Sequence, residues 1–287
     1  MKISLYKDRT MFECVEATFD FLRANRRIWL RSALLLLLPI CIVVALVFFS
    51  SLDEDQMPKD LSFWFDYFFS RLEEHPAVLM IAAYVGITMV LVHVFSLVMA
   101  NLDYEDGVGG CSLSDLKPYF IRTLKRSWYL PFTFVLAIII VNIAPFLTLL
   151  VLVVLVPLAL MPSYRLVERL GVVESMTVAL KKGFSVWFHL LINIVLMSLL
   201  GLYVFLFLWI PTTILSLVIE TFSVKQISEW ETLLVLGLGF VFTAVALFGI
   251  LVVMSLVVLT CAFLYGSLSE RVDAASVDNE VAHFEQL

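Results

Sequence analysis

The chain has 287 residues, of which 62% are hydrophobic and 15% are charged. Soluble domains average roughly 45 to 50% apolar and about 25% charged residues, so the composition excludes a soluble globular protein and predicts an all-α, polytopic membrane protein. The net charge of −6 excludes little, because the distribution of Lys and Arg between the two sides of the membrane governs orientation. The apolar excess lies in five charge-free runs: Ser32–Leu52, His75–Leu102, Ser127–Tyr164, Gly183–Ile219 and Thr232–Ser269.

The segment before the first apolar run is rich in Lys and Arg, so it is expected to stay on the cytoplasmic side. Within it, Phe12, Val15, Phe19 and Leu22 recur at helical spacing. This pattern predicts an amphipathic helix over residues 11–25 that lies on the membrane surface and leads into the first span. Because acidic residues precede the run and it lacks a small-residue cleavage site, the run is expected to be an uncleaved anchor and not a signal peptide.

The polar segment Asp53–Glu74 is acidic, as expected of an external loop. Over Asp60–Glu74, apolar and aromatic residues occupy one helical face and polar residues the other. We expect a helix that lies flat on the outer membrane surface. The same aromatic face would equally suit packing against neighbouring helices.

After the second span, three glycines within residues 107–110 are followed by Ser112 and Ser114. These residues predict a flexible turn before a capped, basic helix. The glycine stretch is not a nucleotide phosphate loop, because it lacks the Lys-Ser/Thr pair that completes that motif and no strand precedes it. No nucleic-acid partner is expected.

Three stretches share one spaced pattern, in which an acidic residue is followed by an apolar-basic pair and then by Trp. They are Glu16, Leu22, Arg23 and Trp29; Asp115, Ile121, Arg122 and Trp128; and Glu174, Leu180, Lys181 and Trp187. We interpret each as an amphipathic lead-in helix in the headgroup region, with its basic residue and its Trp as interfacial anchors. The alternative is a loose pattern that any membrane protein gives, since basic and aromatic residues gather at helix ends.

The run Ser127–Tyr164 is too long for one span of about 20 residues, and a hairpin that turns near Asn142–Pro145 keeps more Lys and Arg inside. The two later long runs are predicted to be single helices, joined by an acidic external segment. The prediction is one integral membrane domain of six spans in three hairpins, each preceded by an interfacial amphipathic helix, with both termini cytoplasmic. Its parts are residues 1–102, 103–163 and 164–269, followed by a mobile tail at 270–287.

Few polar residues fall inside the predicted spans: His93 and Ser96, Asn142, and the trio Ser185, His189 and Asn193. The trio is spaced by four residues and is expected to share one face with Gly201. His93, His189, Asn193 and Ser185 are therefore candidate contacts for a lipid headgroup or small ligand. The alternatives are hydrogen bonds between helices, worth about 1 kcal/mol each, and, for His93, a lone packed histidine.

Catalytic and cofactor chemistry is not predicted. No acidic or basic residue lies within a predicted hydrocarbon core apart from Arg31 at its boundary, which argues against an ion-driven pump. No His-Glu-x-x-His or Gly-x-Ser-x-Gly motif occurs, and no His has a metal partner at recognisable spacing. The four cysteines imply no disulfide framework.

The stretch Val-Glu-Ser-Met-x-x-Ala-Leu-Lys-Lys-Gly-Phe at 173–184, the basic N-terminal helix and the prolines at 131, 145, 157 and 162 carry a family resemblance. The chain resembles a bacterial group of six-span inner-membrane proteins that includes the membrane domain attached to some glycerophosphodiester phosphodiesterases. The resemblance is strongest from Pro157 to Trp187. It implies a bacterial cytoplasmic membrane and an envelope or lipid context, and it carries over no active site because the phosphodiesterase barrel is absent.

The function expected from the sequence is that of a non-catalytic integral membrane protein. It would assist envelope or lipid homeostasis, or serve as a subunit of a membrane assembly, with the lipid bilayer and either a membrane-protein partner or a second copy as its partners. The alternative is a passive or lipid-type transporter whose pathway is lined by His93, His189 and Asn193.

Overall fold

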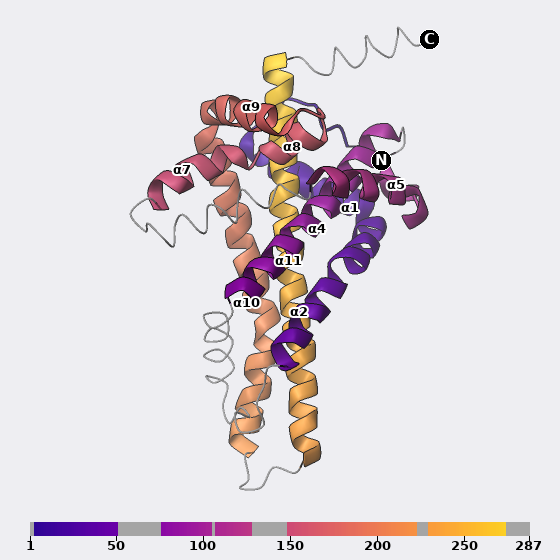
Figure 1. Cartoon of the computed structure of the whole chain (residues 1–287), viewed down its shortest axis with the longest axis vertical. Helices are drawn as coiled ribbons and strands as arrows, with labels where there is room; N and C mark the ends of the chain where they lie inside the picture. The colour runs from indigo at the N-terminus through magenta and orange to yellow at the C-terminus, as the bar shows by residue number, and fades with distance from the viewer. Residues whose placement is uncertain (1–2, 51–75, 105–106, 128–147, 223–228, 274–287) are drawn as a thin grey trace.

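A computed structural model describes residues 3–50, 76–104, 107–127, 148–222 and 229–273 (Figure 1). Within these ranges every regular element is a helix. The predicted surface helix at 60–74, the predicted turn at 142–145, Trp128 and most of the tail lie outside the described residues.

Helix α1, Met11–Leu36, contains the predicted lead-in helix and the start of the first span. It begins where the backbone N–H of Thr10 donates to the Glu13 carboxylate at 2.6 Å, which satisfies one free donor of the first turn. At Asn25 the backbone leaves helical geometry, with φ −114° and ψ 16°. The Asn25 side chain donates to the Phe21 carbonyl at 3.0 Å. The bend therefore lies at the last residue of the predicted amphipathic helix, 11–25. Helix α2, Leu38–Ser50, continues the apolar segment.

Helix α4, Pro76–Asp103, leads to a short 3₁₀ turn at Val108–Gly110 and then to α5, Leu113–Ser127. Gly107 adopts φ 76°, a left-handed conformation that glycine accepts without a steric penalty. The backbone N–H of Ser112 donates to Asp115 Oδ2 at 2.8 Å. The predicted glycine turn and capped helix are therefore both present.

The rest of the described chain is α7, Thr148–Leu158; α8, Met161–Leu166; α9, Val172–Ser185; α10, Trp187–Phe222; and α11, Glu229–Asp273. The chain bends by 93° between α9 and the first part of α10. Consequently α9 crosses the end of the long α10–α11 pair (Figure 1).

The last apolar run is a single helix, as predicted, and lies within α11. The run before it is only partly so, because Gly183–Ser185 belong to α9 and the remainder forms α10 after a bend. With 36 and 45 residues and a rise of 1.5 Å per residue, α10 and α11 extend about 54 and about 68 Å. Both exceed a hydrocarbon core about 30 Å thick, so each has residues beyond it. The two helices lie side by side (Figure 1) and approach closely at Gly201, where a Cβ would lie 2.0 Å from Val253 Cγ1.

Within the described residues, three helical stretches are long and apolar enough to cross a membrane: Met11–Val47, Met80–Asp103 and Phe240–Arg271. A fourth is present if α9 and the first part of α10 form one bent span. These helices indicate a membrane-embedded protein.

The main core lies at one end of the helices rather than along their length. Phe21 contacts Phe263 edge-on with ring centroids 6.0 Å apart, and Tyr164 contacts Tyr265 at 5.0 Å. Both pairs join segments distant in sequence at the end of the molecule where α5, α8 and α9 lie (Figure 1). We call residues 3–25 together with α5, α8 and α9 the cap region. Large apolar side chains of α2 and of the second half of α1, in contrast, are exposed, as expected of helices that face lipid.

Candidate functional site

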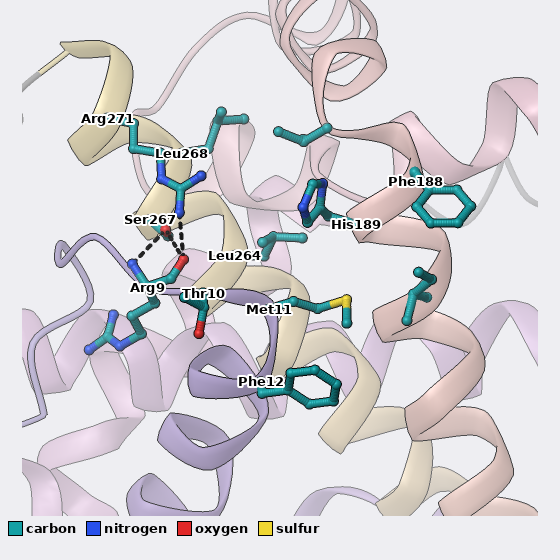
Figure 2. A pocket seen from close by; sticks show the side chains of 12 residues that line it. Arg9, Thr10, Met11, Phe12, Phe188, His189, Leu264, Ser267, Leu268 and Arg271 are labelled. Carbon is teal, nitrogen blue, oxygen red and sulfur yellow. Dashed lines mark hydrogen bonds between the residues drawn. The ribbon is translucent and has the colours of Figure 1, made fainter.

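A cavity of about 360 Å³ lies where the N-terminal segment, the start of α10 and the end of α11 meet. We call it the junction pocket. Figure 2 shows Arg9, Ser267 and Arg271 along one wall, His189 and Phe188 on α10 on the other, and Met11 and Phe12 near the start of α1. It brings one predicted residue, His189, together with residues from both ends of the chain.

The first wall depends on the N-terminal segment, which lies directly against α11. A Cβ at Gly266 would lie 2.2 Å from the Leu5 carbonyl oxygen, so only glycine permits this approach. The backbone N–H of Arg9 donates to Ser267 Oγ at 3.0 Å, and the Ser267 hydroxyl donates to the Arg9 carbonyl, also at 3.0 Å. Asn101 of α4 holds the segment from its other side by donating to the Ile3 carbonyl at 2.9 Å.

The Arg9 guanidinium is buried and stabilises the N-terminal segment from within. It donates to the Ser4 carbonyl at 2.6 Å and to the Leu5 carbonyl at 3.1 Å, and it lies 5.3 Å from the centre of the Phe263 ring. Burial lowers the pKa of Arg9 below its usual 12.5, but a guanidinium stays protonated at physiological pH. Arg9 therefore places a fixed positive charge behind this wall.

Arg271 forms the part of this wall nearest the C-terminal end of α11. Its Nε forms an ion pair with Asp8, and its terminal nitrogen donates to the Arg9 carbonyl at 2.9 Å. The side chain remains about half exposed. This wall is therefore polar and basic, with Asp8 offsetting one of its two arginine charges.

The second wall is positioned by the bend at Val186, whose φ and ψ are −120° and 19°. The first two turns of α10 contribute Phe188, His189 and Ile192 to the pocket lining. His189 is exposed and has no hydrogen-bond partner within the described chain. Phe12 and Phe188 are 69% and 63% exposed. The pocket thus combines an available imidazole and a basic wall with an apolar surface, which suits a ligand with a polar head and an apolar body.

The helical face predicted for Ser185, His189 and Asn193 is divided by the same bend. Ser185 is the last residue of α9, and its hydroxyl donates to the Lys182 carbonyl at 2.6 Å. Because the helix is interrupted after it, Ser185 does not continue the face of His189 and Asn193. Asn193 lies one turn beyond His189, is 1% exposed, and has no hydrogen-bond partner for either amide atom within the described residues.

His93 lies apart from this pocket, between α4 and α1. It is fully buried, its Nδ1 lies 3.1 Å from Ser32 Oγ, and its ring contacts Trp29 edge-on at 5.2 Å. This arrangement matches the alternative interpretation of His93 as a packed histidine. Its described contacts are with α1 and not with His189 or Asn193 of α10.

Two of the three predicted tryptophan anchors contact protein. Trp29 is buried against His93, and the Trp187 indole N–H donates to the Val153 carbonyl at 3.0 Å. Both rings lie against neighbouring helices, Trp29 against α4 and Trp187 against α7. Each ring buries apolar area there, and the Trp187 N–H finds a partner. The predicted basic anchors stay accessible: Arg23 and Lys181 are exposed, and Arg122 lies 5.7 Å from the Tyr119 ring centre.

Sequence reasoning missed Arg9, Ser267 and Arg271, because their contacts join residues more than 250 positions apart. The adjacent small residues Gly266 and Ser267 near the end of α11 were the one local signal of a close approach. The four cysteines are free, and no cluster of three or more potential metal ligands occurs among the described residues. The chain has no match among protein-family models, curated proteins or solved structures.

Proposed function

We propose that this chain is a non-catalytic integral membrane protein that holds a membrane lipid in the junction pocket, as a helper in envelope or lipid homeostasis or as a subunit of a membrane assembly. The observation that carries the proposal is the meeting of His189 and Arg271 with exposed apolar side chains in one cavity. The lipid headgroup would contact His189 and Arg271, and its chain would lie along Phe12 and Phe188.

A lipid suits this pocket better than a small polar solute. Polar solutes gain nothing from the exposed rings of Phe12 and Phe188, whereas an acyl chain gains about 25 cal/mol for each Å² of apolar surface removed from water. The cavity of about 360 Å³ accommodates a headgroup and the first part of a chain, and the remainder would extend into the bilayer.

The cap region would lie on the cytoplasmic side, because Lys and Arg are concentrated in its segments. The resemblance to bacterial inner-membrane proteins supports a cytoplasmic membrane as the location. It also supports a lipid context, in agreement with an amphipathic pocket.

The test is native mass spectrometry of the full-length protein released from a mild detergent. Phe188→Ala and His189→Ala are expected to lower the occupancy of co-purified lipid several-fold. Phe207→Ala is the matched control, since Phe207 is 65% exposed on the same helix but does not line the pocket. Unchanged occupancy in both pocket variants would contradict the proposal.

A passive or lipid-type transporter is the second candidate, favoured by the buried and unpartnered Asn193 amide. Ala substitution at His189 and Asn193 together would then abolish lipid transport into liposomes without lowering expression; His93 is left out because it packs against α1. Retained transport would remove these residues from the pathway.

A further inference from the structure

We propose that a second recess, formed by Arg23, Arg26 and Arg27 with the glycine turn at Gly109, is a binding site for a phosphate group. The recess has a volume of about 460 Å³. None of its residues lines the junction pocket, so the inference stands independently of the lipid proposed there.

The three arginines meet at the recess from both sides of the bend in α1. Arg23 precedes Asn25, and Arg26 and Arg27 follow it. Like charges that lie close together repel one another. An anion bound among them would offset that repulsion.

Among the described residues, little negative charge neutralises these three arginines. Arg23 lies 3.4 Å from Asp20 in an exposed ion pair, and such pairs contribute little. Arg26 and Arg27 are exposed and form no ion pair with any described residue. Their planar guanidinium groups match phosphate oxygens in a two-pronged geometry.

The glycine turn closes the recess without adding a side chain. A Cβ at Gly109 would lie 3.2 Å from the Ala24 carbonyl and 3.3 Å from Asn25 Oδ1, whereas Gly110 has open space around it. The turn therefore lies tightly against the bend of α1 and leaves room beside the arginines. Charge on the guanidinium groups, and not a nucleotide-binding loop motif, would attract the ligand.

The position along α1 places the recess at the membrane boundary. Leu30 and Leu34 are exposed apolar residues, and Leu30 follows Arg27 by a rise of about 4.5 Å. Arginines at this depth are at the level of lipid phosphates. The phosphate could belong to a lipid headgroup or to a soluble phosphate compound, and both present the same oxyanion to the arginines.

The experiment uses the full-length protein in phosphatidylcholine nanodiscs, with two probes. One probe is inorganic phosphate, followed by phosphorus NMR line broadening. The other is phosphatidylglycerol, added in detergent and counted as bound lipid by native mass spectrometry. Arg26→Gln/Arg27→Gln is expected to weaken binding roughly tenfold or more for whichever probe binds the unmodified protein, because charge-assisted hydrogen bonds are lost.

The matched control is Lys117→Gln/Lys125→Gln, which removes the same charge from exposed positions of the cap region outside the recess. It should bind as the unmodified protein does, and Arg26→Lys/Arg27→Lys should retain part of the affinity. If the Arg26→Gln/Arg27→Gln variant loses binding of phosphatidylglycerol alone, the ligand is a lipid headgroup. If it loses binding of inorganic phosphate alone, the ligand is a soluble phosphate compound. Equal binding by the arginine variant and the unmodified protein, or equal loss in the lysine control, would overturn the proposal.

Discussion

Arg9 and Ser267 lie 258 positions apart in the sequence and exchange two hydrogen bonds, each 3.0 Å long. The backbone N–H of Arg9 donates to the serine oxygen, and the serine hydroxyl donates to the Arg9 carbonyl. One small side chain therefore satisfies both backbone groups of a buried residue and fixes the N-terminal segment to α11. This contact builds the basic wall of the junction pocket.

Ser267→Ala should release the N-terminal segment. The substitution leaves the buried Arg9 N–H without a partner and leaves the Arg9 carbonyl with the Arg271 donor alone. A buried polar group without a partner costs about 1 to 3 kcal/mol. Hydrogen exchange of residues 3–10 should become faster, while exchange in the middle of α4 stays unchanged. Ser198→Ala, at an exposed position of α10, is the control, and equal exchange in both variants would contradict the role of Ser267.

Gly266→Ala should destabilise the same contact sterically. The new methyl group would lie 2.2 Å from the Leu5 carbonyl oxygen, and such overpacking typically costs about 1 to 3 kcal/mol. Thermal unfolding in a mild detergent measures the loss. Gly237→Ala, on the same helix with no atom within 4 Å of the added Cβ, should be neutral or stabilising because alanine favours helix.

Gly201 and Val253 should be energetically coupled. A Cβ at Gly201 would lie 2.0 Å from Val253 Cγ1, so Gly201→Ala should push α10 away from α11. Val253→Ala removes the obstructing methyl groups, and the double variant should be more stable than the sum of the single effects predicts, by about 0.5 to 3 kcal/mol. Purely additive effects in a double-mutant cycle would show that the two positions are not in contact.

The hydrogen bonds between Ser112 and Asp115 at the N-terminus of α5 should be weakened by acid. The backbone N–H and the hydroxyl of Ser112 hold the pKa of Asp115 below its usual 3.8. A carboxyl whose pKa is lower in the folded state stabilises that state above its unfolded pKa, and the contribution disappears as the pH falls through the folded pKa.

Asp115→Asn should therefore speed hydrogen exchange of the first turn of α5 at neutral pH. The difference between the variant and the unmodified protein should diminish as the pH falls below 3.8 and through the lowered pKa of folded Asp115, because both side chains are then uncharged. A difference that stays constant across this range would contradict the charged cap.

Local patterns predicted local structure well. The apolar spacing of residues 11–25 ends at Asn25, where α1 bends, and Ser112 caps α5 as its position indicated. Both features depend on a few consecutive residues, whose helical spacing and capping preference act over one or two turns.

Contacts between distant segments could not be predicted in this way. Nothing near Arg9 in the sequence indicates that Ser267 will lie beside it. The bend at Val186 was also missed: a charge-free run from Gly183 onward favours a continuous helix, whereas the chain turns by 93°. That turn separates Ser185 from His189 and brings His189 to the pocket.

The most direct test of a lipid in the junction pocket is crosslinking with a phospholipid that carries a photoreactive diazirine near the start of its acyl chain. After reconstitution and illumination, mass spectrometry maps the labelled peptides of the full-length protein. The pocket predicts strong labelling of the segments around Phe12 and Phe188, lost in His189→Ala, and weak labelling around Phe207, which is equally exposed. Equal labelling of Phe188 and Phe207 in the unmodified protein would mean that lipid only surrounds these helices, and would contradict a bound lipid in the pocket.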